Sequence, residues 1–198
     1  MMQFSIVEQI ALAVFLLSGI SFFLYHLLIR LKIVLKGKSN FSVDELPKRI
    51  KRVFDEVILH KKVASGKRKS AGILHALVMY GFIFFGLITI NHFGMAFGLP
   101  IFSDSIRHTY FLFFGAPWAI LCSIGILGLA YRRFVIKPEA LGKFSSTSAI
   151  VSVFIVTLMV TYLIDEFHIL SGTAEKFNWW LHSGVIGGFL FLIPQSKH

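Results

Sequence analysis

The chain has 198 residues, of which 56% are hydrophobic and 15% charged, and it carries a net charge of +10. Average soluble domains have roughly 45–50% apolar and about 25% charged residues, so this composition excludes a disordered chain and argues against an ordinary soluble domain. A single cysteine, Cys122, excludes a disulfide framework. It also excludes an iron–sulfur cluster held by this chain alone, because such clusters need about four thiolates.

Apolar stretches follow one another along the chain. They cover residues 6–29, 71–99, 110–131, 147–170 and 179–194. Four of them have the ~20 residues that a spanning helix needs, and the last is shorter before its proline. The first lacks a basic start and a small-residue cleavage site, so we interpret it as a permanent helix and not as a signal peptide. The sequence predicts an all-α integral membrane protein, with five transmembrane helices in a single domain, residues 1–198.

Lysine and arginine are distributed unevenly between the predicted loops. Of the 20 such residues, 18 lie in 30–69, in 131–146 or after the last helix, and the other side holds only Arg107 and Lys176. The positive-inside rule then predicts an N-terminus outside, a C-terminus in the cytoplasm, and a location in the cell (inner) membrane. The positive-inside rule explains why the chain is basic, so its charge does not indicate binding to nucleic acid. We expect membrane lipid and no nucleic acid as a partner.

Residues 31–70 form a basic cytoplasmic loop that is too long for a simple connector. Apolar residues recur in it at helical spacing, and Pro47 fits a first helical turn. The apolar positions are Val43, Leu46, Ile50, Val53, Val57 and Ile58, with lysine and arginine between them. This pattern predicts an amphipathic helix, which either lies on anionic head groups or docks on a partner subunit.

Histidines within the predicted helices are the candidate functional residues, because ionisable groups at membrane depth are costly and usually functional. The second and fifth helices run antiparallel, so His92 and His182 share the outer leaflet, and His75 and His198 share the inner one. The two levels are about 24–26 Å apart at 1.5 Å per residue. Two imidazoles at one depth on facing helices suit six-coordinate haem iron, so the pattern predicts two haems. His75 and His92 lie about 100° apart around their helix and do not share one strict face.

Several segments resemble a known family. They are Leu74-His75-Ala76-Leu77 with Gly81-Phe82, His92-Phe93-Gly94-Met95, Tyr131-Arg132-Arg133, Trp179-Trp180-Leu181-His182 and Ile193-Pro194-Gln195-Ser196-Lys197. On these residues the chain resembles the membrane cytochrome b domain of the respiratory nitrate reductase gamma subunit. It is closer still to the form associated with heterodisulfide-reductase-like iron–sulfur proteins. The resemblance implies two haem b groups with bis-histidine ligation, a quinone site and a cytoplasmic iron–sulfur subunit or fused domain as electron partner.

The fourth ligand of the family pattern would lie just beyond the end of this chain. Either His198 takes its place, or the chain is the N-terminal part of a longer polypeptide. The predicted iron ligands are therefore His75, His92, His182 and His198. Arg107 and His108, in the outer loop, are the candidate quinone contacts, with menaquinone the expected quinone.

The sequence thus predicts a dihaem subunit of a respiratory-chain oxidoreductase, which transfers electrons between membrane quinone and an iron–sulfur module. Asp165, Glu166 and His168 end the fourth helix, either as proton carriers or as a plain solvated helix end. Two other functions remain open: a transporter or proton channel that uses the intramembrane histidines, and a haem-free membrane anchor. Absence of bound haem would favour either of these two.

Overall fold

A computed structural model describes residues 3–37, 45–59, 69–142 and 144–196, and within these ranges all regular structure is helical. Segments long and apolar enough to cross a membrane cover residues 6–35, 69–96, 104–136 and 146–166. Helices satisfy all their backbone hydrogen bonds internally, which a bilayer requires of a spanning segment. The chain is therefore an all-helical protein with four candidate membrane spans, as a multi-pass membrane protein has.

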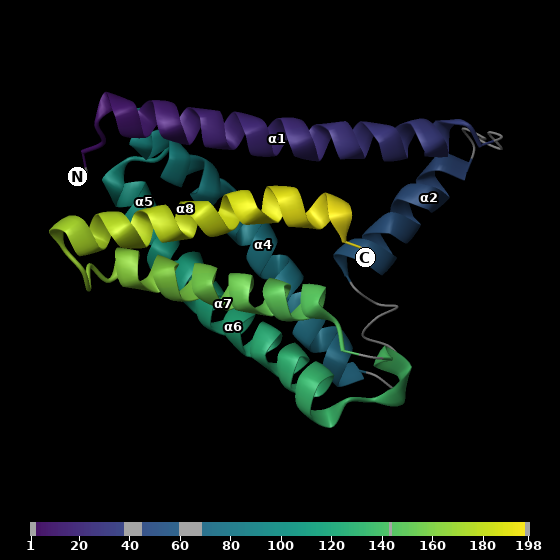
Figure 1. Ribbon diagram of the computed structural model, residues 1–198. Coiled ribbons are helices and arrows are strands. Elements are labelled where there is room, and N and C mark those ends of the chain that lie inside the picture. The colour runs from purple at the N-terminus through teal and green to yellow at the C-terminus, as the bar shows by residue number, and fades with distance from the viewer. Residues whose placement is uncertain (1–2, 38–44, 60–68, 143, 197–198) are drawn as a thin grey trace.

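The helices follow the chain in a simple order (Figure 1). They are α1 (Ile6–Leu35), α2 (Leu46–Val53), η2 (Phe54–Ile58), α4 (Lys69–Ala96), α5 (Asp104–Tyr110), η3 (Phe111–Gly115), α6 (Ala116–Tyr131), η4 (Arg132–Ile136), η5 (Glu139–Leu141), α7 (Ser146–Glu166) and α8 (Gly172–Gln195). The π-helical turn η3 joins α5 to α6, and η4 continues α6, so residues 104–136 form one continuous helix of 33 residues, while η5 is a short 3-10 turn.

The fifth predicted helix is present as α8 but is not among the four candidate spans. Its 24 residues rise about 36 Å, enough for a hydrocarbon core of about 30 Å. Its composition is less apolar because its first turns carry Glu175, Lys176 and Asn178. The helix also begins earlier than expected, since this polar stretch is helical as well.

Two helix ends differ from the predicted bounds for identifiable reasons. α1 continues to Leu35 because Arg30 and Lys32 do not stop a helix; their long side chains keep the charge at the membrane edge. α4 ends at Ala96, before the predicted end at 99, because Gly98 adopts a left-handed conformation with φ 71°. Leu99 N donates to Gly94 O at 2.8 Å, which closes a Schellman cap.

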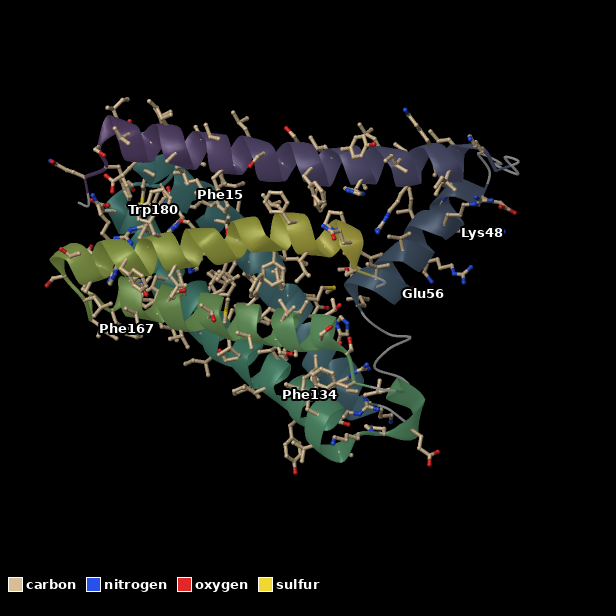
Figure 2. The ribbon with its side chains drawn as sticks, in the orientation of Figure 1. Phe15, Lys48, Glu56, Phe134, Phe167 and Trp180 are labelled. Carbon is tan, nitrogen blue, oxygen red and sulfur yellow. The ribbon has the colours of Figure 1, made fainter. Side chains whose placement is uncertain are left out.

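The bundle is built by successive pairwise packing: α4 on α6, α6 on α7, α7 on α8, and α8 on α1. Small residues allow close approach in the α4–α6 seam, where a Cβ on Gly125 would lie 2.8 Å from Leu74 O. Cys122, 1% exposed, packs in the same seam, as expected of a packing residue. Large apolar side chains project outward all round the helices, as lipid-facing residues do (Figure 2).

The amphipathic helix expected in the basic loop is present as α2 and η2, while Val43 lies outside the described residues. Its charged side chains form ion pairs one turn apart: Arg49 with Glu45, Lys51 with Asp55 and Arg52 with Glu56. Lys48 and Glu56 project from this helix (Figure 2). The helix lies at the end of the bundle opposite the start of α1 (Figure 1).

Candidate functional site: a pocket lined by paired histidines

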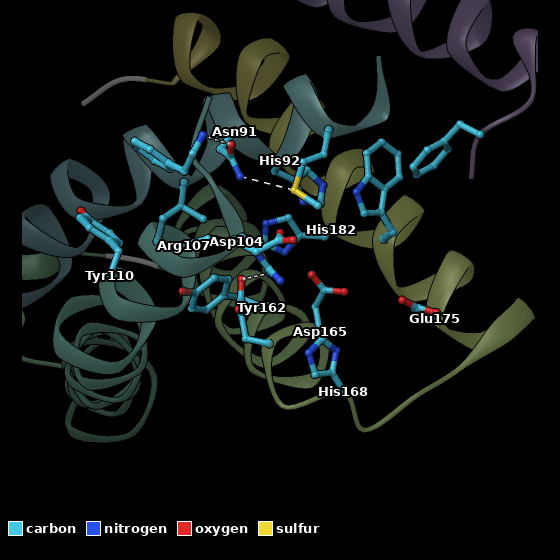
Figure 3. Close-up of a pocket in the computed structure, with 16 residues that line it drawn as sticks. Asn91, His92, Asp104, Arg107, Tyr110, Tyr162, Asp165, His168, Glu175 and His182 are labelled. Carbon is cyan, nitrogen blue, oxygen red and sulfur yellow. Dashed lines mark hydrogen bonds and ion pairs between the residues drawn. The ribbon is translucent and has the colours of Figure 1, made fainter. Parts of the chain in front are cut away.

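A pocket of about 330 Å³ lies where α4 and α7 end and α5 and α8 begin (Figure 3). His92 from α4 and His182 from α8 both line it. The same wall carries carboxylates, one guanidinium and two phenols, all contributed by residues near these helix ends. The pocket thus combines two imidazoles from within the bundle with a charged rim.

The two histidines predicted to share the outer leaflet face each other. The ring centroids of His92 and His182 are 5.0 Å apart, with their planes inclined by 53°. The ring of His92 also stacks on Trp179, at 4.6 Å and 14°. His92 and His182 are far apart in the sequence, and the antiparallel arrangement of α4 and α8 brings their rings together.

Hydroxyl groups orient both imidazoles. Thr161 Oγ1 lies 2.7 Å from His182 Nδ1 and 2.7 Å from the carbonyl oxygen of Thr157. The carbonyl can only accept, so we infer that the Thr161 hydroxyl donates to it and accepts from His182 Nδ1–H. This leaves Nε2 of His182 as the nitrogen with a lone pair, the arrangement typical of a metal-binding histidine. His92 Nε2 lies 3.0 Å from Ser183 Oγ, so it could bind a metal only by giving up that contact.

The remaining predicted ligands are not part of this pocket. His75 is exposed on α4, in keeping with the angular offset between His75 and His92. His198 lies outside the described residues, so the inner pair stays a prediction. His108 is exposed and does not line the pocket, whereas its neighbour Arg107 does.

Arg107 and Glu166 form a largely buried ion pair in the pocket wall. Arg107 Nη1 donates to Glu166 Oε1 at 3.0 Å, and the side chains are 26% and 9% exposed. Arg107 Nε is buried and has no hydrogen-bond partner among the described residues. Glu166 is therefore not a solvated helix end, while His168, two residues on, is exposed. A buried donor without a partner, beside a cavity, is a natural attachment point for an acceptor oxygen.

Asn91 supports the pocket in a way that the sequence analysis missed. It is 3% exposed, and its Oδ1 accepts from the backbone of Ile101 at 2.9 Å and of Phe102 at 3.0 Å. These bonds tie the end of α4 to the loop that leads into α5 and Arg107. The sequence does carry a signal for this role, an amide beside a histidine within an apolar helix. Buried polar groups need hydrogen-bond partners, so such an amide indicates a structural contact.

Three other buried polar residues surround the histidines: Thr161, Asn178 and Ser183. Asn178 Nδ2 donates to Thr161 O at 2.9 Å, which joins α8 to α7 beside His182. None of these was singled out from the sequence, because serine, threonine and asparagine occur in many membrane helices as packing residues. Together they fix the positions of both imidazoles.

The fold and pocket define a helical protein of multi-pass membrane character with a histidine-lined polar site. The chain is 28% identical, over 208 aligned positions, to the probable iron–sulfur-binding oxidoreductase FadF of Bacillus subtilis (strain 168). The alignment covers 89% of this chain and 29% of that protein, so the chain spans less than a third of its relative. No family model matches the chain, and no solved structure gives a significant match.

Proposed function

We propose that the chain is a dihaem b-type membrane domain that transfers electrons between membrane quinone and a cytoplasmic iron–sulfur oxidoreductase module. The observation that carries the proposal is the facing of His92 and His182, 5.0 Å apart, inside a pocket between antiparallel helices. The relative named for iron–sulfur binding supports the proposed partner. The proposal includes five membrane crossings, with α8 as the fifth, and an N-terminus outside the inner membrane.

The residues of the outer site fit a haem. Two imidazoles come from facing helices, and a hydroxyl group contacts each of them. Within the described residues, no three His, Cys, Asp or Glu side chains are grouped to hold a metal ion. A pair of histidines therefore suits a metal that arrives with its own equatorial ligands, as haem iron does. When bound, haem accepts and releases single electrons; the protein supplies the axial ligands and a dry, shaped site.

The charges of the pocket favour a neutral substrate. Asp104, Asp165, Glu166 and Glu175 line it, against the single guanidinium of Arg107. This excess of carboxylates opposes an anionic ligand but tolerates an uncharged quinol. Arg107 Nε can donate to a quinone oxygen, and we therefore place the quinone contact on Arg107 and not on the exposed His108.

The topology supports the other parts of the proposal. The pocket lies at the end of the bundle where α1 begins, and the basic helix α2 lies at the other end (Figure 1). If that basic end faces the cytoplasm, the pocket faces outward. The second haem would be held by His75 together with His198, or by a ligand beyond this chain, near the cytoplasmic partner.

A haem count on purified protein tests the proposal. We expect two b haems per chain in a pyridine haemochrome assay and in a reduced-minus-oxidised spectrum. His92→Ala and His182→Ala should each remove the outer haem, and His75→Ala the inner one. His26→Ala is the matched control, because His26 is also in a long apolar helix but packs against Phe22 and Tyr25, outside the pocket.

The possible outcomes separate the alternatives. Two haems, with one lost in each ligand variant and none in the control, would support the dihaem domain. One haem would indicate that the inner site needs a ligand beyond residue 198. No haem in folded protein would refute the cytochrome and leave the transporter and the anchor.

A further inference from the structure

The ion pair beside the histidines has a chemical use that binding alone does not require. Glu166 is a carboxylate with one oxygen, Oε1, engaged by Arg107, while Oε2 takes no hydrogen bond from any described residue. It lines the same pocket as His92 and His182. A carboxylate that lines a cavity and has an open oxygen is placed to accept a proton from a bound hydroxyl group.

We propose that Glu166 is the base that takes protons from a quinol in this pocket, an inference that rests on the proposed function. Oxidation of a quinol to a quinone breaks two O–H bonds and releases two protons and two electrons. The two electrons would go to the haem that His92 and His182 would hold. Each proton goes to a Glu166 carboxylate oxygen and leaves for water before the next is taken. In the reverse reaction the same group donates protons.

Arg107 has the role of a positioning residue. It holds the Glu166 carboxylate in place through Nη1, while Arg107 Nε is available to the quinol oxygen. A guanidinium does not deprotonate in proteins, so it cannot be the base itself. Glu166 is therefore the base, and Arg107 positions both Glu166 and the quinol.

The groups around Glu166 provide a route outward. The titratable or charged residues that face the pocket are His92 from α4; Asp104, Arg107 and Tyr110 from α5; Tyr162 and Asp165 from α7; His168 after α7; and Glu175 and His182 from α8. Asp165 and His168 lie next to each other at the end of α7, beyond Arg107 as seen from the paired histidines (Figure 3). His168 is exposed, so a proton from Glu166 reaches solvent past this pair.

The test compares Glu166→Gln with Glu8→Gln in the purified, haem-loaded chain. Glutamine keeps the side-chain length and can accept from Arg107, but it cannot take a proton at neutral pH. Glu8 is the matched control, because it is also ion-paired with a cation, Lys176, but does not line the pocket. The measurements are the rate of haem reduction by a soluble quinol, the binding of the fluorescent quinol analogue heptyl-hydroxyquinoline N-oxide, and the haem content.

We expect Glu166→Gln to slow haem reduction by about 100-fold, in the range typical of general acid–base catalysis. Analogue affinity and haem content should change less than about two-fold, and Glu8→Gln should leave the reduction rate unchanged. Glu166→Asp, which retains a carboxylate, should recover most of the rate and also serves if Glu166→Gln does not fold. Glu166→Asn should then be as slow as Glu166→Gln.

Two results would overturn the proposal. In the first, Glu166→Gln reduces haem at the wild-type rate. In the second, rate and analogue affinity fall in parallel, which would make Glu166 a binding residue only. A wild-type chain without haem, or one that no quinol reduces, would refute the proposed function itself. Measurements on the wild-type chain alone give this result, before any variant is made.

Discussion

Gly125 offers a direct test of how closely α4 and α6 must pack. In Gly125→Ala the new Cβ would lie 2.8 Å from Leu74 O, 3.1 Å from Val78 Cγ2 and 3.2 Å from Leu77 Cβ. Ordinary contacts begin near 3.4 Å, so α4 must move away by about 0.6 Å. Overpacking of this kind costs roughly 1–3 kcal/mol.

Gly184→Ala on α8 is the matched control. It gains the same helix propensity, about 1 kcal/mol, but its Cβ would meet nothing within 4 Å. The difference in the free energy of unfolding between the two variants therefore isolates the packing cost, and we expect about 1–3 kcal/mol. Unfolding by SDS in mixed micelles can be followed by fluorescence, because Trp118 of α6 stacks on Phe84 of α4 at 4.8 Å, across this seam. Equal unfolding midpoints for the two variants would refute the packing argument.

Three further predictions concern residues near the pocket. His168 has a left-handed φ of 50°, so His168→Gly should stabilise the protein by about 1 kcal/mol, seen as a higher Tm. Lys176→Met should lower stability by up to about 1 kcal/mol, because it removes a half-exposed ion pair with Glu8; high salt should weaken the wild type similarly in the same melt. Ser183→Ala should retain the outer haem in a pyridine haemochrome count, since it only frees His92 Nε2. Loss of that haem would show instead that the outer site cannot take up haem without the Ser183 hydroxyl.

The helices themselves could be predicted from the sequence because a bilayer demands long apolar segments, and such runs are visible without any knowledge of packing. The shared level of His92 and His182 followed from chain direction alone, since the second and fifth predicted helices run antiparallel. Their packing on Trp179 did not follow, because rotation about a helix axis depends on its neighbours.

The finer parts of the site could not be predicted because they depend on long-range hydrogen bonds. Arg107 was a candidate for a quinone contact, but its pairing with Glu166 joins residues 59 positions apart. The amide of Asn91 beside His92 was a signal, but it does not identify its partners, and Thr161 gave no signal at all; both residues bond backbone groups that every residue possesses. The polar start of α8 was missed because hydropathy identifies the part of a helix within lipid and not the turns that extend beyond it.

The uninterrupted helix from Asp104 to Ile136 is longer than a bilayer is thick. Its 33 residues rise about 50 Å, against a hydrocarbon core of about 30 Å. It must therefore tilt or extend beyond the lipid, and Figure 1 shows α6 running obliquely to α1. Arg107 sits on its first turns, so a change in tilt would move the guanidinium relative to the histidines. We therefore expect bilayer thickness, and with it acyl-chain length, to affect the geometry of the pocket.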